Sequence, residues 1–297
     1  MSECKRTPQQ VGLMWKCTRQ RYASFTGGIG TDISHFVNWV SGCPCRYQYF
    51  SHGYFPVNDL KCLTYSEPID STKPNLLLLP PVQGSQTFFV KQLDLSTSFN
   101  LFFGSYQHSS IRQNAKALVN AMPVERFLIL GISFGGLVGW TAANLHPHKV
   151  SGLITLGTLP AKSFLRRRIL LGGLLFRYLP SSLFTLWYHR KMEIILSREM
   201  FISQHVFQIL SELPSKSVWY QRILAIAKEF PMDSPVVKTL WMWGENDPYV
   251  HWKAKDIALL QPNSKPVSLS GGHFANYSNP QIFKQELERF ISNLTLF

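Results

Sequence analysis

The stretch that most constrains the fold of this chain is residues 126–140, RFLILGISFGGLVGW. Phe127–Leu130 is an apolar run with the length of a fully buried strand. A helix-length segment begins within the stretch and must end before Pro147. Between them lies Gly131-Ile132-Ser133-Phe134-Gly135, a G-x-S-x-G pattern. A serine on a strained turn needs small neighbours, because a β-carbon there would collide with the strand or the helix. The pattern predicts a nucleophile elbow at Ser133, and a glycine-rich turn without chemistry is the alternative.

Short apolar runs alternate with helix-length segments in the rest of the chain. The alternation predicts strands at Leu76–Leu79, Phe99–Phe103, Leu153–Leu156, Thr239–Trp243 and Val267–Leu269, after two short β-like runs between Tyr47 and Tyr65, the second at about Leu60–Tyr65. It also predicts a helix at about Ser110–Ala121 and a last helix with Asn279 as its cap, Pro280 in its first turn and an apolar face of Phe283, Leu287, Phe290, Ile291 and Leu294. Buried strands that alternate with helices are typical of an α/β fold, so we expect a mostly parallel sheet covered by helices on both faces. In such a sheet the functional site lies at the carboxyl ends of the strands.

The alternation stops between residues 161 and 232. This segment holds an apolar run at Ser182–Tyr188 and a helical pattern of Ile202, Val206, Ile209, Leu210 and Leu213 that Pro214 ends. Arg177 and Pro180 interrupt the apolar residues before they reach the length of a membrane span. We therefore predict a basic N-terminal extension at 1–45, a core at 46–160 and 233–297, and a helical cap at 161–232 inserted after the sixth core strand.

The net charge of +13 is concentrated in two segments. Residues 1–50 carry six Lys and Arg against two acids, and residues 161–232 carry eleven against four. Arg166, Arg167 and Arg168 stand beside an apolar run, which suits contact with an anionic membrane, and a solvated basic face is an equal alternative. The sequence resembles no nucleic-acid-binding module, so we expect no nucleic-acid partner.

The five cysteines, Cys4, Cys17, Cys43, Cys45 and Cys62, all fall within the first 62 residues. Their number is odd and they form no C-x-x-C pair, which favours free thiols over a metal site, with a redox pair at Cys43-Pro44-Cys45 as the alternative. Free thiols favour a reducing compartment, so we expect a cytoplasmic protein. If the basic cap binds lipid, the protein would also lie peripherally on intracellular membranes. Residues 1–45 overlap in composition with a mitochondrial transit peptide, which is the alternative to a disordered or loosely docked extension.

Two residues beyond the elbow follow predicted strands and form a catalytic set with Ser133. Asp247 lies in the turn GENDP after the strand at 239–243, and His273 lies in the loop SGGHF after the strand at 267–269. A serine hydroxyl needs a base and a group that orients the base, so His273 would take the Ser133 proton while Asp247 holds the imidazole. His251 is the rival base, although it stands where a helix begins.

An acyl-transfer site also needs backbone N–H groups that point at the oxyanion. The amide of Phe134, directly after the serine, is the first predicted donor. The second should come from the loop after the strand at 76–79, where the first two residues are prolines and have no N–H. Val82 is therefore the predicted second donor, and Gln83 is the next choice.

Residues from about 60 to 297 resemble the α/β-hydrolase fold superfamily through the segments GISFGG, GENDPYV and GGHFANYSNP. The order Ser133, Asp247, His273 is the order of the triad in that family. The loop with Pro80-Pro81 departs from the His-Gly that is usual there and is similar instead to maspardin, a member of the superfamily. The run Phe88-Phe89-Val90-Lys91-Gln92 extends this likeness. The resemblance to maspardin implies an interaction protein of the cytosol and endosomes. Maspardin lacks the base histidine, whereas this sequence keeps His273.

The residues and the resemblance together predict a serine hydrolase that cleaves an ester, thioester or lipid-like substrate through an acyl-enzyme, without a metal or cofactor. A serine at the elbow disfavours haloalkane and epoxide chemistry, for which the resemblance implies an aspartate. The alternative is a maspardin-like scaffold that recruits a protein partner at intracellular membranes.

Overall fold

The computed structural model describes residues 57–60, 62–66, 68–161, 176–250 and 263–294. The predicted extension at 1–45, the start of the predicted β-like region at Tyr47, the arginines at 166–168 and His251 lie outside these ranges. Cys62 is the cysteine that the described ranges include, and it is a free, half-buried thiol with its Sγ 3.8 Å from the Ala117 carbonyl oxygen.

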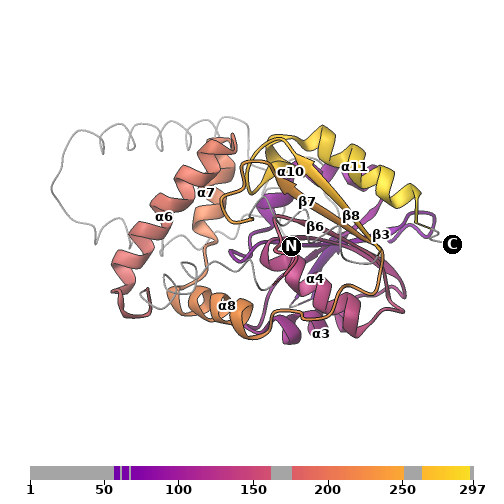
Figure 1. Ribbon diagram of the computed structural model, residues 1–297, viewed down its shortest axis with the longest axis horizontal. Coiled ribbons are helices and arrows are strands. Elements are labelled where there is room, and N and C mark those ends of the chain that lie inside the picture. Colours follow the sequence, from indigo (N-terminus) through magenta and orange to yellow (C-terminus); the bar gives the residue numbers. More distant parts are fainter. Residues whose placement is uncertain (1–56, 61, 67, 162–175, 251–262, 295–297) are drawn as a thin grey trace, which may run out of the picture. The chain divides into compact units, whose positions relative to one another are not determined.

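The described residues form an eight-stranded sheet with the strand order β1-β2-β4-β3-β5-β6-β7-β8 (Figure 1). β1 pairs with β2, and β2 with β4, in the antiparallel sense, and all other neighbours are parallel. The strands are β1 (Val57–Leu60), β2 (Leu63–Ser66), β3 (Asn75–Leu79), β4 (Asn100–Gly104), β5 (Phe127–Ile132), β6 (Val150–Leu156), β7 (Thr239–Gly244) and β8 (Ser264–Leu269).

Helices cover both faces of this sheet. In Figure 1, α3 and α4 lie below it, and α10 and α11 lie above it. The helices are η1 (Gln86–Thr97, a 3₁₀ helix), α3 (Ile111–Ala121), α4 (Phe134–Leu145), α6 (Ser181–Arg198), α7 (Ser203–Ser211), α8 (Lys216–Lys228), α10 (Ala275–Ser278) and α11 (Pro280–Ser292). The arrangement confirms the predicted α/β fold, a mostly parallel sheet with helices on both faces.

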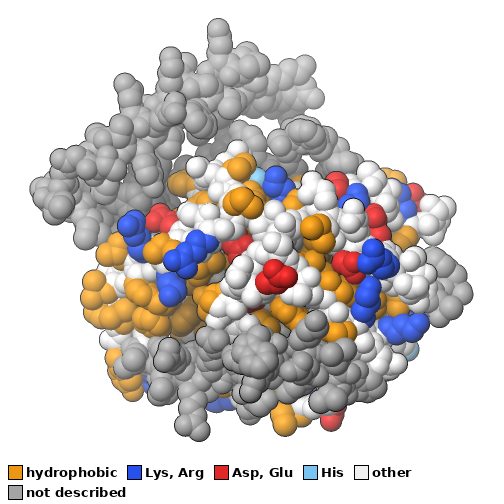
Figure 2. Space-filling model, turned by 45° about the horizontal axis from the view of Figure 1, so that its top comes forward, with side chains coloured by type: hydrophobic (Ala, Val, Ile, Leu, Met, Phe, Trp, Pro, Cys, Tyr) orange, Lys and Arg blue, Asp and Glu red, His pale blue; other side chains and the backbone are white. Residues whose placement is uncertain are grey.

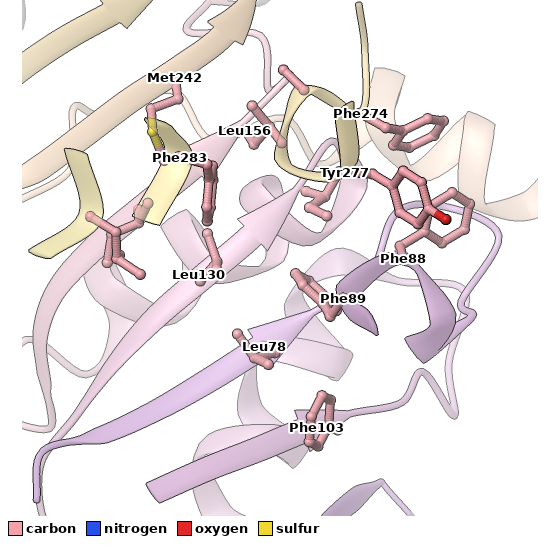
Figure 3. Close-up of a cluster of buried hydrophobic side chains, with 14 of the residues drawn as sticks. Leu78, Phe88, Phe89, Phe103, Leu130, Leu156, Met242, Phe274, Tyr277 and Phe283 are labelled. Carbon is pink, nitrogen blue, oxygen red and sulfur yellow. The ribbon is translucent and has the colours of Figure 1, made fainter. Parts of the chain in front are cut away.

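Successive side chains of one strand enter two different cores, as the pleat of a strand requires. In β3, Leu76 and Leu78 belong to a cluster with residues of η1 and α11, whereas Leu77 and Leu79 belong to a cluster with residues of α3 and α4. Figure 3 shows the first cluster, with Leu78 among the side chains that the sheet contributes. Since both faces of β3 are buried, the strand is a continuous apolar run.

Some predicted details differ from the structure. The run predicted as one strand at about Leu60–Tyr65 is divided, because β1 ends at Leu60 and β2 begins at Leu63. Asn279 precedes α11 as predicted, but its side chain makes no capping hydrogen bond and donates instead to the Ser270 carbonyl oxygen. The other features of the last helix are confirmed, since Pro280 is its first residue and its predicted apolar face is buried.

Between β6 and β7 the chain forms α6, α7 and α8, so the segment that breaks the alternation is helical where the structure describes it. α6 has apolar residues on opposite faces. Its buried face consists of Phe184, Tyr188, Met192 and Leu196. Its outer face carries Leu183, Leu186, Trp187 and Ile194, which are between 37% and 62% exposed. In the ranges that the structure describes, no helix combines the length and the apolar character that crossing a membrane requires.

Candidate active site

Ser133 occupies the turn between β5 and α4 with a strained backbone. Its φ is 54° and its ψ is −111°, a conformation that costs a residue with a β-carbon about 1–3 kcal/mol. Its N–H donates to the Leu156 carbonyl oxygen at 2.7 Å, and Thr158 Oγ1 donates to its carbonyl oxygen at 3.0 Å. Neighbouring strand β6 and the residues after it therefore hold the serine backbone from both sides.

The glycines around Ser133 are needed because other backbone passes close to each of them. A β-carbon on Gly131 would lie 2.5 Å from backbone atoms of Gly135. One on Gly135 would overlap the Leu79 carbonyl oxygen at the end of β3, and one on Gly136 would overlap the Thr158 hydroxyl. These contacts give a physical reason for the glycine pattern at the predicted elbow.

We expect Gly135→Ala to destabilise the protein by about 2 kcal/mol or more, since overpacking against rigid atoms costs about 1–3 kcal/mol and occasionally more. The atoms that the new methyl group meets are the carbonyl oxygens of Leu79 and Pro80, which belong to the backbone and move only with β3. Urea unfolding measures the change. The matched control is Gly139→Ala on the same helix, where the nearest atoms are the side-chain ends of Ile129 and Leu153 at 2.8 and 3.0 Å. Equal stability of the two variants would contradict this explanation.

The structure brings two of the three predicted catalytic side chains into direct contact. His273 Nδ1 and Asp247 Oδ2 are 2.7 Å apart, and both residues are buried. An ionised carboxylate only accepts hydrogen bonds, so Nδ1 carries the proton and Nε2 has a free lone pair. Asp247 Oδ1 accepts from the backbone N–H groups of Tyr249 and Val250 at 2.8 and 3.2 Å. The carboxylate is thus fixed by the turn that follows β7.

The imidazole of His273 packs on Gly157, in the segment that holds the backbone of Ser133. A β-carbon on Gly157 would lie 2.9 Å from Cε1 and Nδ1 of the ring, and Gly157 has a φ of 61°. Its neighbours Leu156 and Thr158 make the two hydrogen bonds to Ser133 described above. Within the described residues no hydrogen bond joins Ser133 Oγ to His273, and catalytic hydrogen bonds in unliganded enzymes are often formed only with the substrate.

The ring of Tyr249 covers another side of His273, with ring centroids 4.9 Å apart at an interplanar angle of 71°. Burial raises the pKa of the Tyr249 hydroxyl, and the nearby Asp247 carboxylate raises it further. The tyrosine therefore stays neutral at physiological pH and packs beside the histidine as an uncharged ring.

The loop after β3 lies against the elbow, since the Leu79 and Pro80 carbonyl oxygens border Gly135. In the described part of the chain, neither the Val82 amide nor the Phe134 amide donates a hydrogen bond to another residue. Two unused donors at this place are compatible with the predicted oxyanion hole. Gly84, with a φ of 87°, donates to the Pro81 carbonyl oxygen at 2.9 Å and closes the loop as a tight turn.

Sequence reasoning missed two buried charged residues that hold the loops of this site. Arg222 of α8 donates from Nη1 to the Val82 carbonyl oxygen at 2.7 Å and from Nη2 to the Tyr106 carbonyl oxygen at 3.3 Å. Burial lowers the pKa of its guanidinium, and the nearby Tyr106 and Tyr188 act in the opposite direction. Glu199, just after α6, accepts hydrogen bonds from both residues that flank His273. No local pattern marks either residue, because each meets its partners through the tertiary fold.

Among the described residues, no group of three or more His, Cys, Asp or Glu side chains is arranged to hold a metal ion. The titratable residues of the site are instead paired with one another or with the backbone, as Asp247 and Glu199 are.

Known proteins resemble this chain in their fold. The model of the α/β hydrolase fold family matches residues 98–179, a segment that includes Ser133. A carboxylesterase of the thaumarchaeon Nitrososphaera gargenis is 16% identical with a TM-score of 0.61, over 81% of this chain and 99% of that chain. A bacterial membrane phospholipase A is 14% identical with a TM-score of 0.65, over 97% and 96%. Epoxide hydrolase A of Mycobacterium thermoresistibile is 15% identical with a TM-score of 0.62, over 82% and 100%.

A search of curated proteins finds no match to the sequence. The strand order, the family match across the elbow and the structural neighbours nevertheless agree with one another. On these grounds the chain has the α/β-hydrolase fold.

Proposed function

We propose that the protein is a serine hydrolase that cleaves an ester, thioester or lipid-like acyl substrate. The observation that carries the proposal is the buried pair of Asp247 and His273, which packs on Gly157 next to the carbonyl group that binds the Ser133 amide. A base with a fixed tautomer and a serine on a strained turn are what nucleophilic acyl transfer requires.

In the proposed reaction, Ser133 Oγ forms a bond to the carbonyl carbon of the substrate while its proton passes to His273 Nε2. Asp247 stabilises the imidazolium that results. The alcohol or thiol then leaves with that proton, and an acyl-enzyme remains on Ser133. Water then attacks the acyl carbon while its proton passes to His273 Nε2. The bond from the acyl carbon to Ser133 Oγ breaks, Oγ takes the proton back from His273, and the acid is released. The amides of Val82 and Phe134 stabilise the oxyanion of both tetrahedral intermediates, with the Gln83 amide as the alternative to that of Val82.

No metal or cofactor takes part in this proposal, because the chain itself supplies the nucleophile, the base and the oxyanion donors. The structural neighbours include a carboxylesterase and an epoxide hydrolase, so the fold does not select the reaction. The serine at the elbow favours acyl transfer over epoxide opening.

The domain division predicted from the sequence is part of the proposal. The helical segment at 161–232 would act as a cap over the acyl-binding region, on a core formed by 46–160 and 233–297. The described part of this segment supports the division, since Glu199, just after α6, and Arg222 of α8 bind the loops around the site.

A fluorophosphonate activity probe tests the proposed function. Such probes phosphonylate a serine that an adjacent base activates, so the wild-type protein should be labelled and peptide mass spectrometry should locate the adduct at Ser133. A folded wild-type protein that stays unlabelled would refute the proposal and favour the alternative, a maspardin-like scaffold that binds a protein partner.

We propose in addition that the protein is cytoplasmic and contacts anionic intracellular membranes through its helical segment. The outer face of α6 supports this, because its exposed apolar residues lie next to Arg190 and Lys191, which are also exposed. Figure 2 shows hydrophobic side chains gathered beside Lys and Arg at the left of the molecule, the side on which α6 lies in Figure 1. Apolar residues with flanking cations suit a helix that lies in a membrane interface.

Replacing Leu183 and Leu186 together with Glu should reduce sedimentation with phosphatidylserine-containing liposomes by about tenfold or more. Neutralising Arg166, Arg167 and Arg168 should reduce it as well, since each cation near an anionic surface contributes about 1 kcal/mol. Ile282→Glu is the matched control, because Ile282 is 47% exposed on the distant helix α11. Unchanged sedimentation of the arginine variant and of the leucine variant would exclude the membrane contact.

A further inference from the structure

We propose that Glu199 is a positioning residue for His273, so that the helical segment inserted after β6 completes the catalytic site. The consequence for catalysis rests on the proposed function, whereas the geometric role of Glu199 can be tested without it. Glu199 follows directly after α6 and is 5% exposed. Its carboxylate points at the loop that carries His273, which follows β8.

The carboxylate of Glu199 binds the backbone on both sides of His273. Oε2 accepts a hydrogen bond from the Gly272 N–H at 3.2 Å, and Oε1 accepts one from the Phe274 N–H at 3.3 Å. Oε2 also accepts from Ser278 Oγ at 3.1 Å, at the end of α10. The residue before His273 and the residue after it are thus fixed to a single carboxylate.

The loop is shaped to admit this carboxylate. A β-carbon on Gly272 would overlap Glu199 Oε1, so the close approach requires glycine at that position. Within the described residues Glu199 forms no ion pair with Lys, Arg or His. A buried carboxylate without a cation is costly unless hydrogen bonds satisfy its oxygens, and here the donors come from the catalytic loop.

The residues that follow Glu199 bind the same part of the chain. The ring of Phe201 stacks on Tyr277 of α10 with centroids 3.5 Å apart. The Tyr277 hydroxyl oxygen accepts from the Ile202 N–H at 3.2 Å and lies 2.8 Å from His205 Nδ1. The segment after α6 therefore contacts α10 at several places. α10 begins two residues after His273, so these contacts also help to fix the loop that carries His273.

Together these contacts fix His273 from two directions. Asp247 orients the imidazole through Nδ1, and Glu199 fixes the backbone from which the side chain extends. A base must stay within hydrogen-bond reach of the serine, and a displacement of about 1 Å can cost about 100-fold in rate. Glu199 thereby links the position of the inserted helices to the position of the proposed base.

Glu199→Gln tests the role with the smallest change of shape. A carboxylate can accept at both oxygens, but an amide has one acceptor and one donor group, so its NH₂ would face the N–H of either Gly272 or Phe274. We expect the second-order rate of fluorophosphonate labelling to fall by about 10- to 100-fold. Glu193→Gln is the matched control, because Glu193 lies on α6 and its salt bridge joins it to the exposed Arg190. The control should label within about twofold of the wild type, as is usual for surface substitutions.

Two readouts separate positioning from a general loss of stability. In a His273→Ala background Glu199→Gln should cause no further loss of labelling, because the residue through which it acts is gone. In ¹⁵N-histidine-labelled protein the Nδ1–H resonance of His273, assigned by its loss in His273→Ala, should shift or broaden in Glu199→Gln and not in Glu193→Gln. Glu199→Asp, which keeps the charge but is shorter, should give intermediate effects and serves if Glu199→Gln does not fold.

The outcomes distinguish this inference from the proposed function. If the wild type is unlabelled, the hydrolase proposal fails, and the His273 resonance still decides the role of Glu199. If the wild type is labelled and Glu199→Gln keeps both the wild-type labelling rate and the wild-type resonance, the positioning role is refuted. An equal loss of labelling with and without His273 would also refute it.

Discussion

Ser133→Ala is expected to abolish fluorophosphonate labelling and to lower the hydrolysis of any ester substrate by about 10⁶-fold, the scale of the loss when a triad serine is removed. The alanine keeps the β-carbon, so it keeps the backbone strain at a φ of 54° and removes only the hydroxyl group. The fold should therefore be retained, and the loss should be chemical.

A panel of 4-nitrophenyl esters with acyl chains of different lengths measures the hydrolysis and also identifies the preferred acyl length. The matched control is Ser268→Ala, since Ser268 is an exposed serine on β8. Thermal unfolding of each variant shows whether the fold is kept. Hydrolysis by a folded Ser133→Ala variant at the wild-type rate would mean that the elbow is not the site of the reaction.

The elbow could be predicted from the sequence because every local requirement for it lies within a few residues. The buried strand reads as a continuous apolar run, and the glycines avoid collisions that the structure locates at Leu79, Gly135 and Thr158. Ser133 itself has a positive φ within this crowded turn. The residues of this one stretch specify the strand, the turn and the helix, which is why β5, the turn and α4 could all be predicted together.

The boundaries of β8 were harder to predict for a physical reason. The sequence suggested Val267–Leu269, whereas the strand begins at Ser264 and includes Lys265 and Pro266. β8 is the last of the described strands in the order of the sheet, so among them it has one neighbour, and it is only partly buried. An edge strand tolerates proline and polar residues, and these conceal it from a search for apolar runs.

The residues that support the site from a distance left no signal in the sequence. Glu199 is 73 residues from Gly272, and Arg222 is 140 residues from Val82. The 3₁₀ helix η1 was also missed, because its turns do not follow the 3.6-residue period by which apolar faces of α-helices are recognised. Local patterns thus predicted the candidate catalytic residues, whereas the contacts that hold them in place could be seen only in the fold.

Asp247→Asn is expected to lower labelling and hydrolysis by about 10⁴-fold, the loss that follows when a triad aspartate no longer fixes the histidine tautomer. The hydrogen bonds in the turn after β7 decide which way the amide group of the variant points. Oδ1 of Asp247 accepts from two backbone N–H groups, those of Tyr249 and Val250, so the amide oxygen of the variant must remain there. Its NH₂ group then faces His273 Nδ1, which becomes an acceptor, and the ring proton moves to Nε2.

A protonated Nε2 cannot take the Ser133 proton, so activity falls although the fold is kept. The opposite amide orientation would preserve the tautomer but place NH₂ against two N–H donors, and it would therefore cost stability instead. Histidine ¹⁵N shifts report the tautomer and urea unfolding reports the stability, so the two arrangements can be told apart. Glu245→Gln, an exposed change in the same turn, is the matched control. If Asp247→Asn keeps wild-type activity, tautomer and stability, Asp247 is a turn residue and the proposed base has no acidic partner.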